Sequence, residues 1–214
     1  MSLGTRPPEG ISITTPGNWM VLDVEGLGDP DAVAALVDAR VAETPDLEPM
    51  RDQIIAIVTE TARQAEEMGV LFAAVMAEVD SEGSVILASA AVAVVPLGSG
   101  SSPQGNGAGA DPAGMPSPED GRLESREEGA IDLPSGQALR IERVNRRSLE
   151  KDGPEVLVYA LEYIMPVPGD ESAAVIAFAT PMMGDRDLLA PIFEEIAESF
   201  SFTWGDAAAG DGGE

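Results

Sequence analysis

Two long apolar segments joined by a short polar link constrain the fold more than any other feature of this sequence. Residues 70–79 and 84–95 are rich in Val, Ile, Leu and Ala and almost free of charge. The link between them, Asp80-Ser81-Glu82-Gly83, is typical of a turn, so the pair predicts a β-hairpin. Because both segments are apolar at nearly every position, we expect them in the centre of a sheet, with helices over at least one face.

Two helices are expected before this hairpin. Asp29-Pro30 provides an N-cap and a first-turn proline, and apolar residues then recur at three- and four-residue spacing until Thr44-Pro45. A longer helix is expected from Asp46, with Pro49 tolerated in its first turn, and Gly69 closes it.

The remaining apolar segments predict strands and one further helix. A final helix that begins at Asp185 or Asp187 leads into a short strand at 201–204. At the start of the chain, two strands are joined by a tight Pro-Gly-Asn bend. These two strands are 11–14 and 20–24, and the other expected strands are 138–147, 155–165 and 173–180.

The composition changes between Leu97 and Gly121, where Gly, Ser and Pro dominate. Such a stretch cannot repay its ordering entropy, so we expect a flexible loop at 97–121 inside one domain that spans 11–204. Residues 1–10 and the acidic tail 205–214 are expected to be disordered. The element order predicts an α+β fold, with helices packed on an antiparallel sheet and a long disordered loop inserted.

Two segments resemble the Mog1/PsbP-like fold family. The segment from Ile11 to Trp19 is similar to the opening strand of that family and its Pro-x-x-Trp turn, here Pro16-Gly17-Asn18-Trp19. The segment from Ile192 to Phe202 is similar to the closing helix and strand. The resemblance implies an α/β/α sandwich. Because the family includes photosystem accessory subunits, a nuclear-transport factor and bacterial envelope proteins, it also implies a binding or accessory module more than a reaction.

The charge balance and the missing residue types exclude several function classes. The chain has 38 acidic and 12 basic residues, a net charge of −26, no histidine and no cysteine. Ser-His-Asp and cysteine catalysis, and metal sites built from histidine or cysteine, are therefore excluded. Nucleic acid and anionic membranes are disfavoured, because both require dense positive charge. The negative charge either serves solubility alone or attracts a protein partner, and it favours a basic partner.

Two short patterns suggest ligands, but neither has the required context. Gly105-x-Gly107-x-x-Ala110 fits a dinucleotide fingerprint, yet no strand precedes it and no helix follows. Glu78-x-Asp80-x-Glu82-Gly83 is similar to half of a calcium loop, but Ser89 stands where the bidentate glutamate is needed. We therefore expect no cofactor, and a polar hairpin tip at 80–83.

Five of the twelve basic residues cluster in one stretch near the middle of the chain. On a strand, Arg140 and Arg146 face one side and the other arginines face the opposite side. These basic residues either pair with nearby carboxylates or form a docking patch. Such a patch would bind an acidic partner or the chain's own acidic tail. The five residues are Arg140, Arg143, Arg146, Arg147 and Lys151.

Tyr159 and Tyr163 share a strand face with Leu157 and Leu161. Aromatic residues at this spacing either fill the core or line a ligand pocket between the sheet and the helices. The first interpretation suits a protein-interaction module and the second a small-molecule binding protein.

The predicted function is a non-enzymatic accessory or protein-interaction module. A small-molecule binding protein is the alternative, and a carboxylate-dependent enzyme ranks third. The first eight residues lack the apolar stretch of a signal peptide, and the apolar run 85–95 is too short to span a bilayer. We therefore expect a cytoplasmic protein that does not bind membranes.

Overall fold

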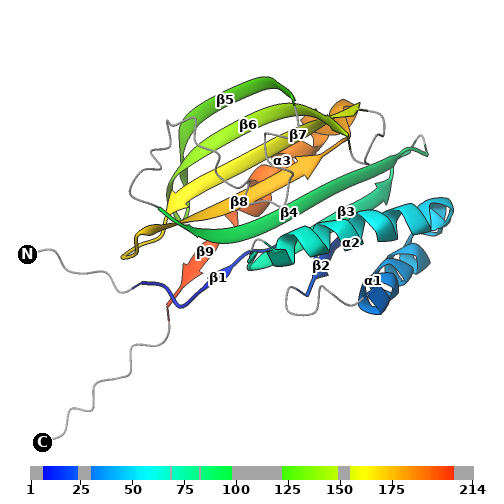
Figure 1. The fold of residues 1–214 in the computed structure, drawn as a ribbon, viewed down its shortest axis with the longest axis horizontal. Coiled ribbons are helices and arrows are strands. Elements are labelled where there is room, and N and C mark those ends of the chain that lie inside the picture. Colours follow the sequence, from blue (N-terminus) through cyan, green and yellow to red (C-terminus); the bar gives the residue numbers. More distant parts are fainter. Residues whose placement is uncertain are drawn as a thin grey trace, which may run out of the picture.

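A seven-stranded antiparallel sheet forms the body of the molecule, and it confirms the predicted α+β class (Figure 1). The computed structural model describes residues 7–23, 30–67, 69–81, 83–97, 122–148 and 155–204. The spatial order of the strands is β2 (Trp19–Leu22), β3 (Phe72–Val79), β4 (Val85–Pro96), β8 (Ser172–Thr180), β7 (Glu155–Pro166), β6 (Gly136–Ser148) and β5 (Arg122–Leu133).

The predicted central hairpin is confirmed as β3 and β4, which pair antiparallel over the whole of β3. At its turn, the Asp80 carboxylate accepts the amide of Ser84 at 2.8 Å. Gly83 has a φ of 83°, a conformation that residues with a Cβ rarely adopt. Successive residues of β4 are buried in two different cores, one on each face of the sheet. This two-sided burial explains why the segment is apolar at nearly every position.

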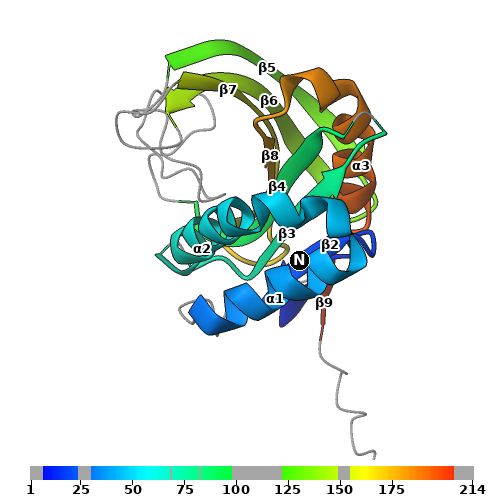
Figure 2. The ribbon, with the colours of Figure 1, turned by 90° about the vertical axis from the view of Figure 1, so that its right-hand side faces the viewer.

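Helices cover both faces of the sheet, and the sheet curves around one of them (Figure 2). The helices α1 (Pro30–Glu43) and α2 (Arg51–Glu67) pack on one face of β2, β3 and β4 through residues such as Val37, Ile54 and Val58. The helix α3 (Arg186–Glu198) lies on the opposite, concave face. Its Phe193 stacks on Phe178 of β8, with ring centroids 4.9 Å apart.

The start of the second helix differs from the prediction. Residues Pro45–Met50 form a 3-10 helix, η1, and the α-helix begins at Arg51 rather than Asp46. Pro49 lies inside η1. Because proline has no amide hydrogen and its ring crowds the preceding turn, regular α-helical hydrogen bonding begins only after it.

The first two strands are joined by a bend, as predicted, but they do not pair with each other. The bend itself is present, because the amide of Trp19 donates to the carbonyl of Pro16 at 3.0 Å. However, β1 (Gly10–Ser12) pairs with β9 (Ser201–Thr203), whereas β2 pairs with β3. The bend therefore passes the chain from a small two-stranded sheet into the large one. The predicted short strand after the last helix is confirmed as β9.

A twelve-residue strand, β5, was not predicted from the sequence. It pairs with β6 along its whole length, with a β-bulge between Leu123 and Ser125. Its first nine residues are all exposed. The preceding residues 98–121, which make up most of the predicted loop, and the predicted tail 205–214 lie outside the described residues.

Candidate functional site

The strand β6 places the predicted arginines on both faces of the sheet. Arg140 and Arg146 lie on the face toward α3, and Arg143 lies on the opposite face, as the strand alternation predicts. Arg147 keeps its place in β6, but its side chain is outside the description, and Lys151 falls in a gap of the described chain. The arginines therefore belong to two separate environments.

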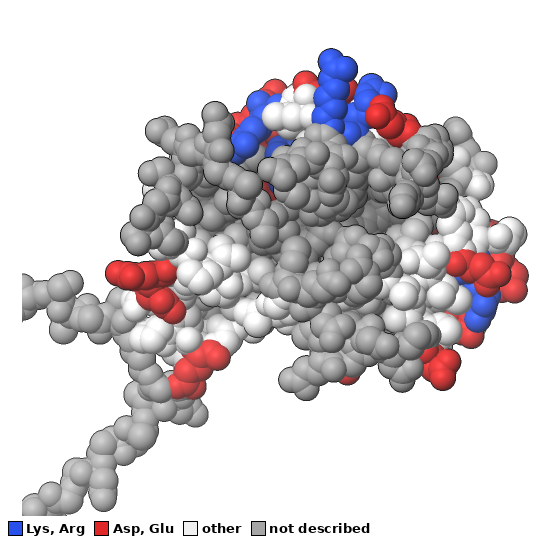
Figure 3. All heavy atoms as spheres, in the orientation of Figure 1, with Lys and Arg blue, Asp and Glu red and all other residues white. Residues whose placement is uncertain are grey.

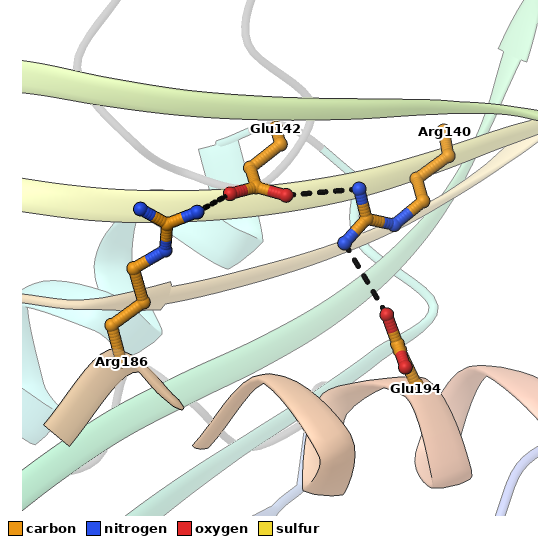
Figure 4. Close-up of polar contacts among 4 residues, drawn as sticks. All are labelled: Arg140, Glu142, Arg186 and Glu194. Carbon is orange, nitrogen blue, oxygen red and sulfur yellow. Dashed lines mark hydrogen bonds and ion pairs between the residues drawn. The ribbon is translucent and has the colours of Figure 1, made fainter. Parts of the chain in front are cut away.

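Arg140 belongs to a group of four ionic side chains that bridges β6 and α3 (Figure 4). It donates to Glu142 at 2.9 Å and to Glu194 at 3.3 Å, and Arg186 donates to the second carboxylate oxygen of Glu142. The Glu142 side chain is 11% exposed, whereas Arg186 and Glu194 are 41% and 46% exposed. We call Arg140, Glu142, Arg186 and Glu194 the bridging cluster. Its two positive and two negative charges sum to zero.

The tyrosines of β7, Tyr159 and Tyr163, lie beside the bridging cluster and are fully buried. Tyr159 stacks on Phe193 at 6.5 Å, and the guanidinium of Arg186 lies 5.0 Å from the Tyr159 ring centroid. The rings of Tyr163 and Phe178 pack edge to face, with their centroids 6.4 Å apart. Both tyrosines share one face, as predicted, and their rings pack within the core that α3 covers.

The hydroxyls of these tyrosines are buried polar groups. Neither hydroxyl has a hydrogen-bond partner among the described residues. The guanidinium of Arg140 lies toward Tyr163, and that of Arg186 lies toward Tyr159. Burial raises the pKa of Tyr163 to about 12, while the guanidinium of Arg140 opposes this effect. Burial also raises the pKa of Tyr159, and Glu142 adds to the increase. Both phenols therefore keep their protons at neutral pH.

Arg143 forms a buried ion pair on the other face of the sheet. It donates to Glu162 of β7, and the two residues are 8% and 4% exposed. Val158 and Ala160 are buried beside the pair. Because separating two such charges is costly, this pair holds β6 and β7 in register more than it offers a surface to a partner.

The exposed charges of β5 form ion pairs along the edge of the sheet. Arg146 of β6 contacts Glu124 at 2.9 Å, Arg122 contacts the same carboxylate at 3.9 Å, and Arg126 contacts Glu128 at 2.5 Å. The hydrogen bond from Arg146 lowers the pKa of Glu124. Figure 3 shows basic and acidic side chains intermixed at the end of the molecule where Figure 1 places β5 and β6. Glu124 was missed as a partner of Arg146 because β5 itself was not predicted.

The described residues were searched for membrane-spanning helices and for metal sites. In that part of the chain, no helix is long and apolar enough to cross a membrane. Within the same residues, no group of three or more acidic side chains is arranged to hold a metal ion. The cytoplasmic location, the lack of a cofactor and the lack of catalysis stay predictions.

No family model and no curated protein matches this sequence. Among solved structures, the crystal structure of LpqN, involved in cell envelope biogenesis of Mycobacterium tuberculosis, is similar with a TM-score of 0.41 and 14% identity. The match covers 91% of this chain and 86% of LpqN. A likeness this distant says nothing about what this chain binds or does. Membership of the Mog1/PsbP-like family stays a prediction.

Proposed function

We propose that this chain is a non-enzymatic interaction module that takes an extended segment of a partner protein as an added strand beside β5. The observation that carries the proposal is the exposure of β5, whose first nine residues are all accessible and whose single neighbour in the described sheet is β6. Alternate residues of an antiparallel strand direct their N–H and C=O groups away from the paired neighbour. Such an edge offers main-chain hydrogen bonds to an incoming strand.

The charges favour a partner segment with basic residues. The whole chain carries −26, and β5 contains four acidic residues against two arginines. Long-range attraction of this kind speeds encounter with a basic partner and weakens as salt is added. An accessory role also agrees with the resemblance to the Mog1/PsbP-like family, which is part of this proposal.

The same edge is protected against indiscriminate pairing. Charged side chains and β-bulges both discourage edge-to-edge association, and β5 has both, with its bulge between Leu123 and Ser125. A strand that pairs here must therefore match the twist and the charges of β5, which favours one partner over nonspecific aggregation.

Two neighbouring proline variants test strand addition directly. The backbone N–H groups of successive strand residues point to opposite edges of the strand. One of the amides of Glu127 and Glu128 therefore faces β6, and the other faces outward. Proline at the outward position removes a donor for the partner and spares the pairing with β6, whereas proline at the other position lowers the stability of β5 itself. Each variant of the intact chain is used to capture partners from the native lysate at low and high salt, followed by mass spectrometry and thermal unfolding.

Glu127→Gln and Glu128→Gln are the matched controls, because they remove the same charges and keep the amides. We expect one stoichiometric, salt-sensitive partner that both glutamine variants retain. One proline variant should lose it at least about tenfold with an unchanged melting temperature, as the loss of a main-chain contact predicts. Equal capture by all four variants would place the docking surface elsewhere. The absence of any partner would overturn the proposal in favour of the small-molecule alternative.

A further inference from the structure

Hydrogen-bond donors outnumber acceptors beside the two tyrosines. A neutral phenol has one proton to donate. The guanidiniums that face the two hydroxyls hold donors only, and Glu142 and Glu194 act on the tyrosines through their charge without a hydrogen bond to either hydroxyl. The carboxylates of the bridging cluster already accept from those same guanidiniums. The O–H protons of Tyr159 and Tyr163 therefore lack an acceptor among the described residues. Buried polar groups of this kind are where ordered water or a ligand is found.

The donors come from three elements and converge on one place. Arg140 lies on β6, the two tyrosines lie on β7, and Arg186 begins α3. Guanidinium and hydroxyl groups together are the donors that recognise a carboxylate, and charge-assisted hydrogen bonds of this type are the strong ones. Glu142 shows that the arginines fit such a group, because they donate to its two oxygens, one each.

The bridging cluster is also accessible from solvent. Arg186 and Glu194 are close to half exposed, and Figure 4 shows the ion pairs that link these α3 side chains to Glu142 and Arg140 of β6. The exposed ends of these ion pairs contribute little to stability, so contacts to a ligand can replace them there, whereas Glu142 is 11% exposed and must turn aside.

We propose that the bridging cluster is a binding site for a small monocarboxylate. The carboxylate of the ligand displaces that of Glu142 from Arg140 and Arg186. In this position it also accepts the O–H protons of the two tyrosines. A single negative charge fits best, because the cluster is neutral by itself and a dianion such as phosphate meets stronger repulsion from Glu142, Glu194 and the rest of the chain. This site is separate from the β5 edge, so it stands independently of the proposed interaction function.

The tyrosine content of the chain provides a direct readout. The sequence has two tyrosines in all, so 13C labelling of the tyrosine Cζ atom alone gives two NMR signals, which Tyr159→Phe and Tyr163→Phe assign. The intact chain is titrated with benzoate at constant ionic strength, with sodium chloride and inorganic phosphate as comparisons. We expect both signals to shift along one saturating curve with benzoate, weakly with phosphate and not with chloride.

Variants then show which groups hold the ligand. Glu142→Gln removes the competing carboxylate and is expected to tighten benzoate binding about tenfold, and Arg186→Gln to weaken it about tenfold, the usual effect of one charge-assisted hydrogen bond. Arg51→Gln is the matched control, because Arg51 pairs with Asp38 on the surface of the other helical layer and should leave binding unchanged.

Two results would overturn the proposal. The first is the absence of a saturable shift of either tyrosine signal in both the wild type and Glu142→Gln, which would assign the hydroxyls to internal water. The second is an affinity that neither Arg186→Gln nor Tyr159→Phe changes. Tyr159→Phe keeps the packed ring and removes only the hydroxyl, so a loss of affinity in this variant supports direct contact even where Arg186→Gln disturbs the start of α3.

Discussion

The strands β8 and β5 belong to one sheet, with only β7 and β6 between them, yet their environments are opposite. All nine residues of β8 are buried, and the first nine residues of β5 are exposed. β8 lies under α3 on one face, and its residues enter a buried core. β5 instead is held by its pairing with β6 and by arginine–glutamate contacts.

This contrast separates where the molecule gains stability from where it presents chemistry. The part of the sheet that includes β3, β4 and β8 buries apolar side chains on both faces, and such burial is the main favourable term in folding. At the other end of the sheet, the first nine residues of β5 are exposed, together with the charges they carry. The bridging cluster lies between these regions, where the apolar core changes into ion pairs. The following changes are ordered from the largest expected effect to the smallest.

Phe193→Ala tests the packed region most severely. The Phe193 ring lies at the centre of the aromatic cluster and contacts Trp19, Tyr159 and Phe178. Removing a buried phenyl ring leaves a cavity and costs about 4 kcal/mol of unfolding free energy. Urea denaturation measures this, and a loss below about 1 kcal/mol would show that α3 is not a main support of the core.

Glu162→Ala tests whether buried charge, rather than apolar packing, fixes the middle of the sheet. It leaves Arg143 without its buried carboxylate and should cost about 3 kcal/mol. The double variant Arg143→Met with Glu162→Leu replaces the pair by apolar groups of similar size and should recover most of that loss. Equal stability of the single and double variants in urea denaturation would contradict this assignment.

Alkaline pH tests the burial of Tyr163. The pKa of this phenol is about 12 in the folded chain and about 10 when unfolded, so the folded state holds the proton more tightly. Its contribution to stability is fully present below pH 10 and is lost as the pH rises from about 10 toward 12. Urea midpoints at pH 9, 10 and 11 should fall less steeply in Tyr163→Phe than in the wild type. Parallel curves would mean that the Tyr163 hydroxyl is solvated.

Leu123→Ala tests the exposed end of the sheet. The Leu123 side chain is half exposed on β5, so its removal should change the unfolding free energy by about 0.5 kcal/mol or less. Thermal unfolding of this variant is compared with that of Phe193→Ala. A large loss in Leu123→Ala would show that β5 is covered in solution, for example by the partner strand proposed above.

The sequence predicts most of the packed region because burial leaves a repeating pattern. The apolar residues of β4 and the spaced apolar residues of α3 both record contact with a core. The alternation of β6 could also be read, since Arg140 and Arg143 lie on opposite faces as expected. The strand β5 shows no such pattern, because apolar and polar residues need not alternate in a segment that is exposed on both faces.

The candidate sites were only partly visible in the sequence for a related reason. Arg140, Tyr159 and Tyr163 stand out by composition and spacing, but Arg186 and Glu194 reach the bridging cluster from a helix 44 and 54 residues away along the chain from their partners. Contacts of that kind depend on how the sheet curves over α3, which no local pattern encodes.

The pairing of β1 with β9 has a consequence for how the chain is made. The amide of Thr14 donates to the hydroxyl of Ser199 at 2.9 Å, across 185 residues of sequence, and β1 and β9 are the first and last strands of the described chain. During synthesis, Ile11 therefore leaves the ribosome long before Phe202, which lies opposite it in the pair. Closing so long a loop is slow, because its entropic cost must be met before the contacts between β1 and β9 stabilise the chain. The apolar Ile11 of the first strand therefore stays without this partner strand until β9 has been synthesised.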